Sequence, residues 1–362
     1  MKKLISLGNQ NLTKSKMLPS SQLKKIRKEL EEHKNPLIFF HDDPDGVCSF
    51  LQFYRFVGDG KGIIIKSFPE LGPDMLRKVD EYQPDIVFVL DKPTISQDFI
   101  DGIKSKVVII DHHPPPKEPY RNCDYYNPRV QDPKDNSPVS SICYNVVKQD
   151  IWIAMTGTVG DWTLPDFLPE FQKAYPSLIP EKIKTPQDAL FTTKLGTLVR
   201  IFSFILKGNS YEAMSCIKVI TRIKHPDEIL EQTSPQGKYI YKKYQKVNQQ
   251  YQELLKIIKQ ASQKSKKLLS YIYSNRNSFT SDLSNELIYL FPDKVVLIGR
   301  EKSGEVKCSL RSTKIILPPI VEELFKSVEG YGGGHEHACG ICVKTKDFEK
   351  FIKLLKHFIP PV

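Results

Sequence analysis

Short apolar runs separated by helix-length segments dominate the N-terminal part of the chain. Four such runs precede residue 111, at residues 37–40, 62–65, 86–90 and 107–110. They are rich in Ile, Val and Phe and lack polar alternation, which is typical of strands buried on both faces of a sheet. Residues 49–57 and 75–82, which lie between runs, have a helical pattern. This order predicts an α/β fold with a doubly wound, mostly parallel sheet.

Downstream, the pattern predicts more helices, a linker and a second, smaller domain. Residues 142–155 and 190–224 have helical patterns, whereas the proline-rich residues 114–138 predict a loop. Residues 226–269 are polar, with apolar residues at wide intervals, and predict one long helix. The expected parts are an N-terminal domain at residues 1–225, a helical linker at 226–267 and a C-terminal domain at 268–362.

The C-terminal domain is also expected to be α/β. Residues 294–298 and 305–310 are strand-like. They are followed by a helix near 321–328, a glycine-rich turn, a strand near 341–343 and a final helix at 348–358. The chain therefore predicts two α/β domains joined by a long helix.

The composition favours a polyanionic partner without requiring one. Lys and Arg outnumber Asp and Glu by 53 to 42, which gives a formal charge of +11. Such a chain attracts an extended polyanion at long range. The alternative is a Lys-rich proteome, in which case the excess carries no information about a ligand.

Cysteine usage and hydrophobicity predict a cytoplasmic protein with no membrane association. The seven cysteines are scattered and form no repeated CxxC pair, so we expect reduced thiols. Residues 4–16 are interrupted by Asn and Lys and lack the apolar core of a signal peptide. No apolar run approaches the roughly twenty residues that cross a bilayer.

The first, third and fourth predicted strands each end in acidic or histidine residues. These are the HDDPDG sequence at residues 41–46, Asp91, and Asp111-His112-His113. A further apolar segment ends in Gly160-Asp161. The carboxyl ends of parallel strands open on one crevice of the sheet, so we expect these clusters to converge.

A metal centre explains such a concentration of carboxylates. Without a cation the carboxylates would repel one another and raise one another's pKa values. Aspartates with one or two imidazoles form a hard site suited to Mn²⁺ or Mg²⁺ more than to thiolate-bound zinc. Two ions about 3.5 to 4 Å apart activate a water and stabilise both oxygens of a phosphoester displacement. The clusters therefore predict phosphoryl chemistry.

Each cluster alone has a simpler interpretation. Asp91 or Asp161 by itself can be a helix cap, and His41 can be a structural histidine at a strand end. The four clusters together, in this order, favour the metal centre.

These motifs make the chain resemble the DHH phosphoesterase family, which is named after the triplet at 111–113. The HxDxDG motif of the family is matched at 41–46, its second motif by Asp91 and its fourth by Asp161. The resemblance implies a two-metal centre with Asp91 as the bridge, His113 facing the scissile phosphate and Asp111 as a second catalytic residue. The implied metal ligands are His41, Asp43, Asp45, Asp91, His112 and Asp161. His41 can equally contact one of the other ligands without binding the metal itself.

The C-terminal domain resembles the DHH-associated domain of RecJ-like nucleases and oligoribonucleases. Its GGGH signature is matched at 332–335 and its SxRS strand at 309–312. The resemblance implies an active site in the cleft between the two domains. The implied substrate-binding residues are Ser309, Arg311, Gly333, Gly334, His335 and His337. Taken alone, a glycine run predicts only a tight turn.

The resemblance and the linker composition together favour single-stranded nucleic acid. Residues 238–246 interleave Lys and Tyr, which suits phosphate neutralisation and base stacking, although such a stretch can also be a solvated helix face. We expect a RecJ-like exonuclease that hydrolyses single-stranded DNA or RNA from an end. The family also contains oligoribonucleases (nano-RNases) and cyclic-dinucleotide phosphodiesterases, and both remain alternatives.

An alternative of another class is a replication scaffold that has lost catalysis. Such proteins lose carboxylates and histidines from the motifs, whereas each is present here. A replication or repair protein as an additional partner is compatible with the sequence.

Overall fold

The computed structural model describes residues 17–66, 69–263 and 265–359. They form two compact units, and the chain passes from one to the other between Tyr244 and Gln245. Residues 4–16, on which the expectation about a signal peptide rests, lie outside the described residues. No helix in the described ranges is both long and apolar enough to span a membrane.

The N-terminal unit is built on the predicted doubly wound sheet. Its five parallel strands lie in the order β2-β1-β3-β4-β5. The strands are β1 (Pro36–His41), β2 (Lys61–Ile65), β3 (Ile86–Leu90), β4 (Lys106–Ile110) and β5 (Asp124–Tyr126). Because β2 lies on one side of β1 and β3 on the other, the winding reverses there. In such sheets ligands bind at the carboxyl ends of the strands beside this point.

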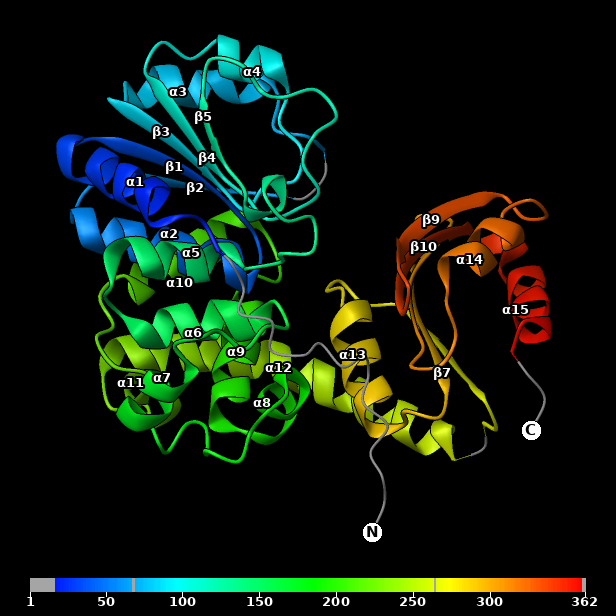
Figure 1. Cartoon of the computed structure of the whole chain (residues 1–362). Coiled ribbons are helices and arrows are strands. Elements are labelled where there is room, and N and C mark those ends of the chain that lie inside the picture. Colours follow the sequence, from blue (N-terminus) through cyan, green and yellow to red (C-terminus); the bar gives the residue numbers. More distant parts are fainter. Residues whose placement is uncertain (1–16, 67–68, 264, 360–362) are drawn as a thin grey trace. The chain divides into compact units, whose positions relative to one another are not determined.

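Different helices cover the two faces of the sheet, as Figure 1 shows. They are α3 (Leu76–Tyr82) and α4 (Gln97–Asp101) on one face and α2 (Pro44–Val57) on the other, with α1 (Ser20–Glu32) and α5 (Val139–Val147) packed beside α2. Phe39 packs edge-on against Phe99 of α4 with ring centroids 5.5 Å apart, whereas Phe40 stacks on Phe50 of α2 at 4.4 Å. Both faces of the central strands are therefore buried, which explains their uniformly apolar sequences.

Further helices complete this unit. They are α6 (Ile151–Gly160), α7 (Leu168–Ala174), α8 (Pro186–Thr192), α9 (Lys194–Ile205), α10 (Ser210–Ile220) and α11 (Asp227–Leu230). Helix α6 is buried along nearly its whole length and packs against α2, α5 and α9. A helix in this position is apolar on all sides, and the sequence of α6 follows that rule.

Some predicted elements have different bounds in the structure. The expected loop at 114–138 contains β5, which is too short and too polar to stand out as an apolar run. The helical stretch at 142–155 is divided between α5 and α6, with Lys148 and Asp150 in the left-handed region at the break. The long helix is likewise interrupted at Gln232, which has a φ of 54°, so that α11 ends before α12 (Pro235–Ser262) begins.

The C-terminal unit holds a five-stranded mixed sheet in the order β6-β7-β8-β10-β9, in which only β6 and β7 are parallel. The strands are β6 (Leu268–Tyr273), β7 (Val295–Lys302), β8 (Glu305–Arg311), β9 (Gly330–His335) and β10 (Ala338–Lys344). The helices are α13 (Thr280–Leu290), α14 (Pro318–Leu324) and α15 (Phe348–His357). The predicted glycine-rich turn is thus the edge strand β9, because its backbone pairs with β10 along six residues.

Candidate metal centre

The turn from β1 into α2 fixes the first cluster. His41 is the last residue of β1, and Asp43 caps α2 by accepting a hydrogen bond from the Gly46 amide at 2.9 Å. A Cβ on Gly46 would lie 2.5 Å from the His41 carbonyl oxygen. The motif glycine is therefore required by this close approach of two backbone segments.

Asp45 is buried in the first turn of α2, and the start of α5 holds its carboxylate. The Val139 amide donates to Oδ2 at 2.8 Å, and the Ser140 amide donates to Oδ1 at 2.9 Å. The Ser140 hydroxyl also donates to Oδ1. A helix N-terminus favours negative charge, but burial and the nearby Asp91 charge still raise the pKa of Asp45 to about 7.

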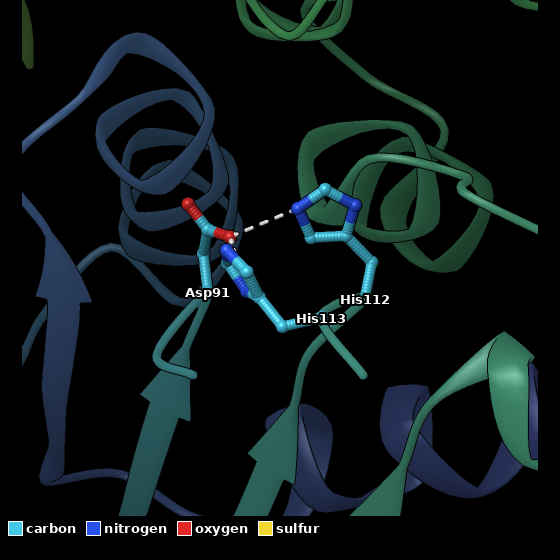
Figure 2. Close-up of side chains that lie close together, drawn as sticks. All are labelled: Asp91, His112 and His113. Atoms are coloured by element: carbon cyan, nitrogen blue, oxygen red, sulfur yellow. Dashed lines mark ion pairs between the residues drawn. The ribbon is translucent and has the colours of Figure 1, made fainter. Parts of the chain in front are cut away.

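Asp91 lies at the centre of the site and is 1% exposed. It follows β3 with a φ of 60°, a conformation that Asp adopts more readily than most residues. Its Oδ1 is 3.3 Å from His112 Nε2, and its Oδ2 is 3.4 Å from His41 Nδ1. Figure 2 shows both imidazoles of the triplet turned toward the Asp91 carboxylate, with His113 Nδ1 3.8 Å from Oδ1.

Asp161 approaches from the C-terminal end of α6, where its Oδ2 is 3.7 Å from His112 Nδ1. It is the residue that follows Gly160, and burial raises its pKa well above the ordinary value. The helix end thus delivers a carboxylate to the same imidazole that contacts Asp91.

Three sets of side chains share these residues and form one continuous cluster. Within each set the potential ligand atoms lie within 4.8 Å of one another. The sets are Asp91-His112-His113, His41-Asp43-Asp91 and Asp45-His112-Asp161. The structure therefore brings together the six residues expected to bind metal.

The unsatisfied polar atoms of the cluster fit a bound cation. Both Asp91 oxygens, His112 Nδ1 and Asp161 Oδ2 are buried and make no hydrogen bond within the described residues. Their contacts of 3.3 to 3.8 Å with neighbouring groups are too long or misdirected for hydrogen bonds. Buried polar atoms in this condition cost free energy, and a cation among them would satisfy all of them. Carboxylate oxygens with imidazole nitrogens suit Mn²⁺ or Mg²⁺.

The imidazoles balance the charge of the buried carboxylates. Burial by itself lowers the pKa of His41, but the Asp43 and Asp91 carboxylates outweigh burial and raise this pKa to about 11. Against the same effect of burial, Asp91 and Asp161 raise the pKa of His112 well above its ordinary value. Burial would raise the pKa of Asp91, but the His112 and His41 imidazoles hold it below the usual range.

Asp111 lies outside the three sets and orients His113. Its Oδ1 is 2.8 Å from His113 Nδ1, and its Oδ2 accepts a hydrogen bond from the His113 amide at 3.2 Å. Asn127 donates to the His113 carbonyl oxygen at 2.9 Å. The side chain of His113 is 32% exposed and that of His112 only 7%. His113 is therefore the imidazole of the triplet that is more accessible from outside.

Lys92, the residue after Asp91, is buried and bonds to the backbone. It is 2% exposed, and its ammonium group donates to the carbonyl oxygens of Lys66 and Pro69 at 2.8 Å each. The side chain of Lys66 in turn forms an ion pair with Asp42. Lys92 thus holds the backbone at Lys66 and at Pro69.

Ser309, Arg311, Gly333 and His335, four of the six predicted substrate-binding residues, lie on two alternate rungs of the C-terminal sheet, and Gly334 lies on the rung between them. The two alternate rungs are Ser309-Gly340-Gly333 and Arg311-Ala338-His335. Residues two apart on a strand share a face, so Ser309, Arg311 and His335 share one face with small residues between them. A Cβ on Gly333 or Gly340 would meet nothing within 4 Å, so the space beside these glycines is open.

The surroundings of these residues fix their positions. Arg311 Nε donates to Asn285 Oδ1 at 2.7 Å, and Ser309 Oγ lies 3.2 Å from Ser281 Oγ. Gly334 has a φ of 153°, and a Cβ there would lie 2.2 Å from the Ala338 carbonyl oxygen. His337 follows β9, with Nδ1 3.2 Å from the Ile315 carbonyl oxygen.

Sequence reasoning missed the residues that position the predicted metal-binding, catalytic and substrate-binding residues. Ser140, Asn127 and Asn285 belong to no motif, and each reaches its partner only in the folded chain. Ser140 is 95 positions from Asp45 in the sequence. Lys92 directly follows the motif residue Asp91, and from the sequence it is expected to contact phosphate or to reach solvent. In the structure it is instead buried and donates to backbone carbonyl oxygens.

Two family models match the chain. Residues 35–158 match the DHH family, N-terminal domain, and residues 266–360 match the DHHA1 domain. No curated protein matches the chain.

Solved structures share the fold at low sequence identity. RecJ from Thermus thermophilus in complex with Mn²⁺ has a TM-score of 0.64 at 15% identity, with 96% of this chain and 56% of that chain covered. An exonuclease RecJ bound to manganese has a TM-score of 0.62 at 15% identity, with 94% and 95% covered. The DHH domain of a member of the s1p family of ribosomal proteins has a TM-score of 0.60 at 12% identity, with 93% and 89% covered. The chain thus spans about 56% of the Thermus protein, and these likenesses show the fold alone.

The fold, the family matches and the His/Asp cluster together define a metal-dependent phosphoesterase. The chain belongs to the DHH family and carries a C-terminal DHHA1 domain.

Proposed function

We propose that the protein is a two-metal phosphodiesterase that hydrolyses single-stranded DNA or RNA from one end. The observation that carries the proposal is the set of three overlapping ligand clusters around Asp91 and His112. The presence of Mn²⁺ in the similar RecJ structures supports Mn²⁺ or Mg²⁺ as the ion.

The overlapping sets of side chains support one division of the ligands between two ions. His41 and Asp43 would hold one ion, Asp45, His112 and Asp161 the other, and Asp91 would bridge the two. When bound, the two ions activate a water and stabilise charge on the attacking and leaving oxygens of a phosphodiester. Both oxygens of Asp91 lack a hydrogen bond within the described residues, which suits a bridging carboxylate.

His113 would contact the substrate and not the ions. Asp111 engages its Nδ1, so Nε2 is the ring nitrogen that remains to face a ligand. A histidine held in this way can act on a bound phosphodiester as a general acid at the leaving oxygen. The role of Asp111 is to keep the ring in this orientation, as carboxylates do for catalytic histidines elsewhere.

The C-terminal sheet, taken by itself, carries groups suited to binding phosphate. The open space beside Gly333 and Gly340 lies on the same face of the sheet as the side chains of Ser309 and Arg311. A guanidinium is a strong donor to phosphate, and glycines allow a ligand to approach the backbone closely. The net charge of +11 favours the approach of a polyanion.

The test is hydrolysis of end-labelled single strands of DNA and RNA of graded length with Mn²⁺, Mg²⁺ or EDTA. We expect stepwise shortening only with metal, and loss of activity in Asp91→Asn. The matched control is Asp98→Asn, an exposed Asp in the first turn of α4, which should retain full activity.

Other outcomes assign the alternatives. Cleavage confined to the shortest oligomers indicates an oligoribonuclease, and cleavage of a cyclic dinucleotide but no linear strand indicates a cyclic-dinucleotide phosphodiesterase. Absence of hydrolysis under every metal condition supports the replication scaffold. Full activity of Asp91→Asn contradicts the two-metal assignment.

A further inference from the structure

Trp162 directly follows the candidate ligand Asp161 at the end of α6. Three backbone hydrogen bonds close the helix there: Asp161 N to Gly157 O at 3.0 Å, Trp162 N to Val159 O at 3.0 Å, and Thr163 N to Thr158 O at 3.1 Å. The backbone that places the Asp161 carboxylate therefore also places the Trp162 ring.

The backbone of Trp162 is strained. Its φ is 59°, in the left-handed region that usually holds Gly at a helix end. A bulky side chain there costs free energy, and such strain tends to persist at functional sites. Among the non-glycine residues of positive φ in the described chain, Trp162 is the only aromatic one.

The ring of Trp162 is held but not buried. It packs against Phe191 of α8 with ring centroids 6.0 Å apart and an angle of 62° between the rings, and both residues are partly exposed. The other tryptophan, Trp152, is 1% exposed and packs against Phe202 inside the unit. Trp152 is thus an ordinary core residue, whereas Trp162 keeps aromatic surface accessible one residue from the metal cluster.

We propose that Trp162 stacks on the base of the nucleotide next to the scissile phosphate. This inference rests on the proposed function, and it adds a nucleobase site to it. Consecutive Cα atoms are only about 3.8 Å apart, so the Trp162 backbone lies beside that of Asp161 and its ring is within reach of the base of a nucleotide whose phosphate is bound at the cluster. Base stacking on an aromatic ring is tolerant of sequence, which suits an enzyme that removes successive nucleotides. Phe191 supports the ring from the side.

The first test compares a normal oligonucleotide with an abasic strand of the same length as substrates for metal-dependent hydrolysis. We expect Trp162→Ala to raise KM for the normal strand roughly tenfold with little change in kcat, and to leave KM for the abasic strand unchanged. Trp162→Phe should recover most of the loss, because it restores a ring. Tyr211→Ala removes an exposed aromatic residue on α10 and is the matched control, with no expected effect.

Folding and stacking are separated by Trp162→Gly. Glycine adopts a positive φ without strain, so this variant should fold, yet it should show the same rise in KM as Trp162→Ala. An unchanged KM in both variants overturns the proposal. Equal loss on normal and abasic strands also overturns it, because the effect would then not depend on a base.

A second readout follows Trp162 directly. The chain has only two tryptophans, so Trp152→Phe makes Trp162 the sole tryptophan emitter. With Asp91→Asn added to prevent cleavage, and Mn²⁺ present, a normal oligonucleotide well above KM should quench the emission and an abasic strand should not. Unchanged emission with the normal strand overturns the proposal. If the wild-type protein hydrolyses no strand at all, the proposed function itself fails, which is a distinct result.

Discussion

Ser140 holds the buried Asp45 carboxylate through its hydroxyl and its amide. Removal of the Ser140 hydroxyl should therefore weaken metal binding. The hydroxyl and the Ser140 amide both donate to Asp45 Oδ1. We expect Ser140→Ala to weaken Mn²⁺ binding about tenfold, because residues that orient a ligand commonly contribute that much. Calorimetric titration of the metal-free protein with Mn²⁺ measures the effect.

A neighbouring serine offers the control for that variant. Ser141 is also buried in α5, and in the described structure it makes no hydrogen bond to Asp45. Ser141→Ala should leave the Mn²⁺ affinity unchanged. Equal affinities in the two variants would show that Asp45 does not depend on Ser140.

The buried side chain of Lys92 should contribute to the free energy of unfolding. Replacement by Met leaves the carbonyl oxygens of Lys66 and Pro69 without this donor, which costs about 1–3 kcal/mol for buried groups. We therefore expect Lys92→Met to lower the free energy of unfolding in urea by an amount in that range. Lys78→Met, at a partly exposed Lys that pairs with the exposed Glu81, should cause little change. Equal free energies of unfolding for Lys92→Met and the wild type would show that the bonds from Lys92 to Lys66 and Pro69 do not stabilise the fold.

At the scale of elements, α12 is unusual in its charge pattern. Residues 235–252 contain four lysines and no Asp or Glu, so no i, i+4 ion pair can neutralise the lysines within this part of the helix. Of the interleaved tyrosines, Tyr244 and Tyr251 are buried at 5% and 1%, whereas Tyr239 is 38% exposed. The predicted base stacking along the linker is therefore restricted by packing, and the lysines are the accessible part.

These lysines should set the salt dependence of strand binding. Lys238, Lys242 and Lys246 are exposed at spacings of four, on one side of α12. Their replacement by Gln should lower the slope of log affinity against log salt concentration by about 2, from about 0.7 for each phosphate contact. The control replaces Lys24, Lys25 and Lys182, which are exposed on other segments. If both triple variants show the wild-type slope, α12 is a solvated face.

At the scale of the whole molecule, the charged cluster links stability to pH and metal. Asp45 has a folded pKa of about 7, above its unfolded value, so it binds a proton more tightly in the folded state. The contribution of Asp45 to the free energy of unfolding therefore falls as pH rises from its unfolded pKa toward 7. His41 has a folded pKa of about 11, so its contribution is complete below the unfolded pKa and is lost as pH rises above that value. Both signs agree, and each full proton is worth about 1.4 kcal/mol per pH unit.

The metal-free protein should therefore lose thermal stability from about pH 6 to pH 9, whereas the protein loaded with Mn²⁺ should not. Metal ligands must be deprotonated, so binding releases protons and the metal affinity rises with pH. Unfolding temperatures of EDTA-treated and Mn²⁺-loaded samples across this range measure the effect. Parallel pH profiles for the two samples would contradict a metal site at these residues.

Much of the fold could be predicted because local physics dominates it. The strands of the first sheet are buried on both faces, so their apolar runs are visible without any partner. Strand β5 and the edge strand β9 could not be found in this way. Residues 124–126 are short and polar, and residues 330–335 read as a turn because glycine lacks the side chain on which a strand pattern depends.

The sequence by itself determined which residues could bind metal and that they converge. Asp43, Asp91 and His112 each follow the end of a predicted parallel strand, and parallel strands bring such ends together whatever the rest of the chain does. The same reasoning placed Asp161 with them, although it is delivered by a helix end and not by a strand.

Only the tertiary structure decided how those residues are held and which remain accessible. Asp45 depends on α5, His113 depends on Asp111 and Asn127, and Trp162 is partly exposed because of how α6 ends beside α8. Burial, hydrogen-bond direction and left-handed backbone arise from contacts between segments distant in the sequence, so no local pattern encodes them.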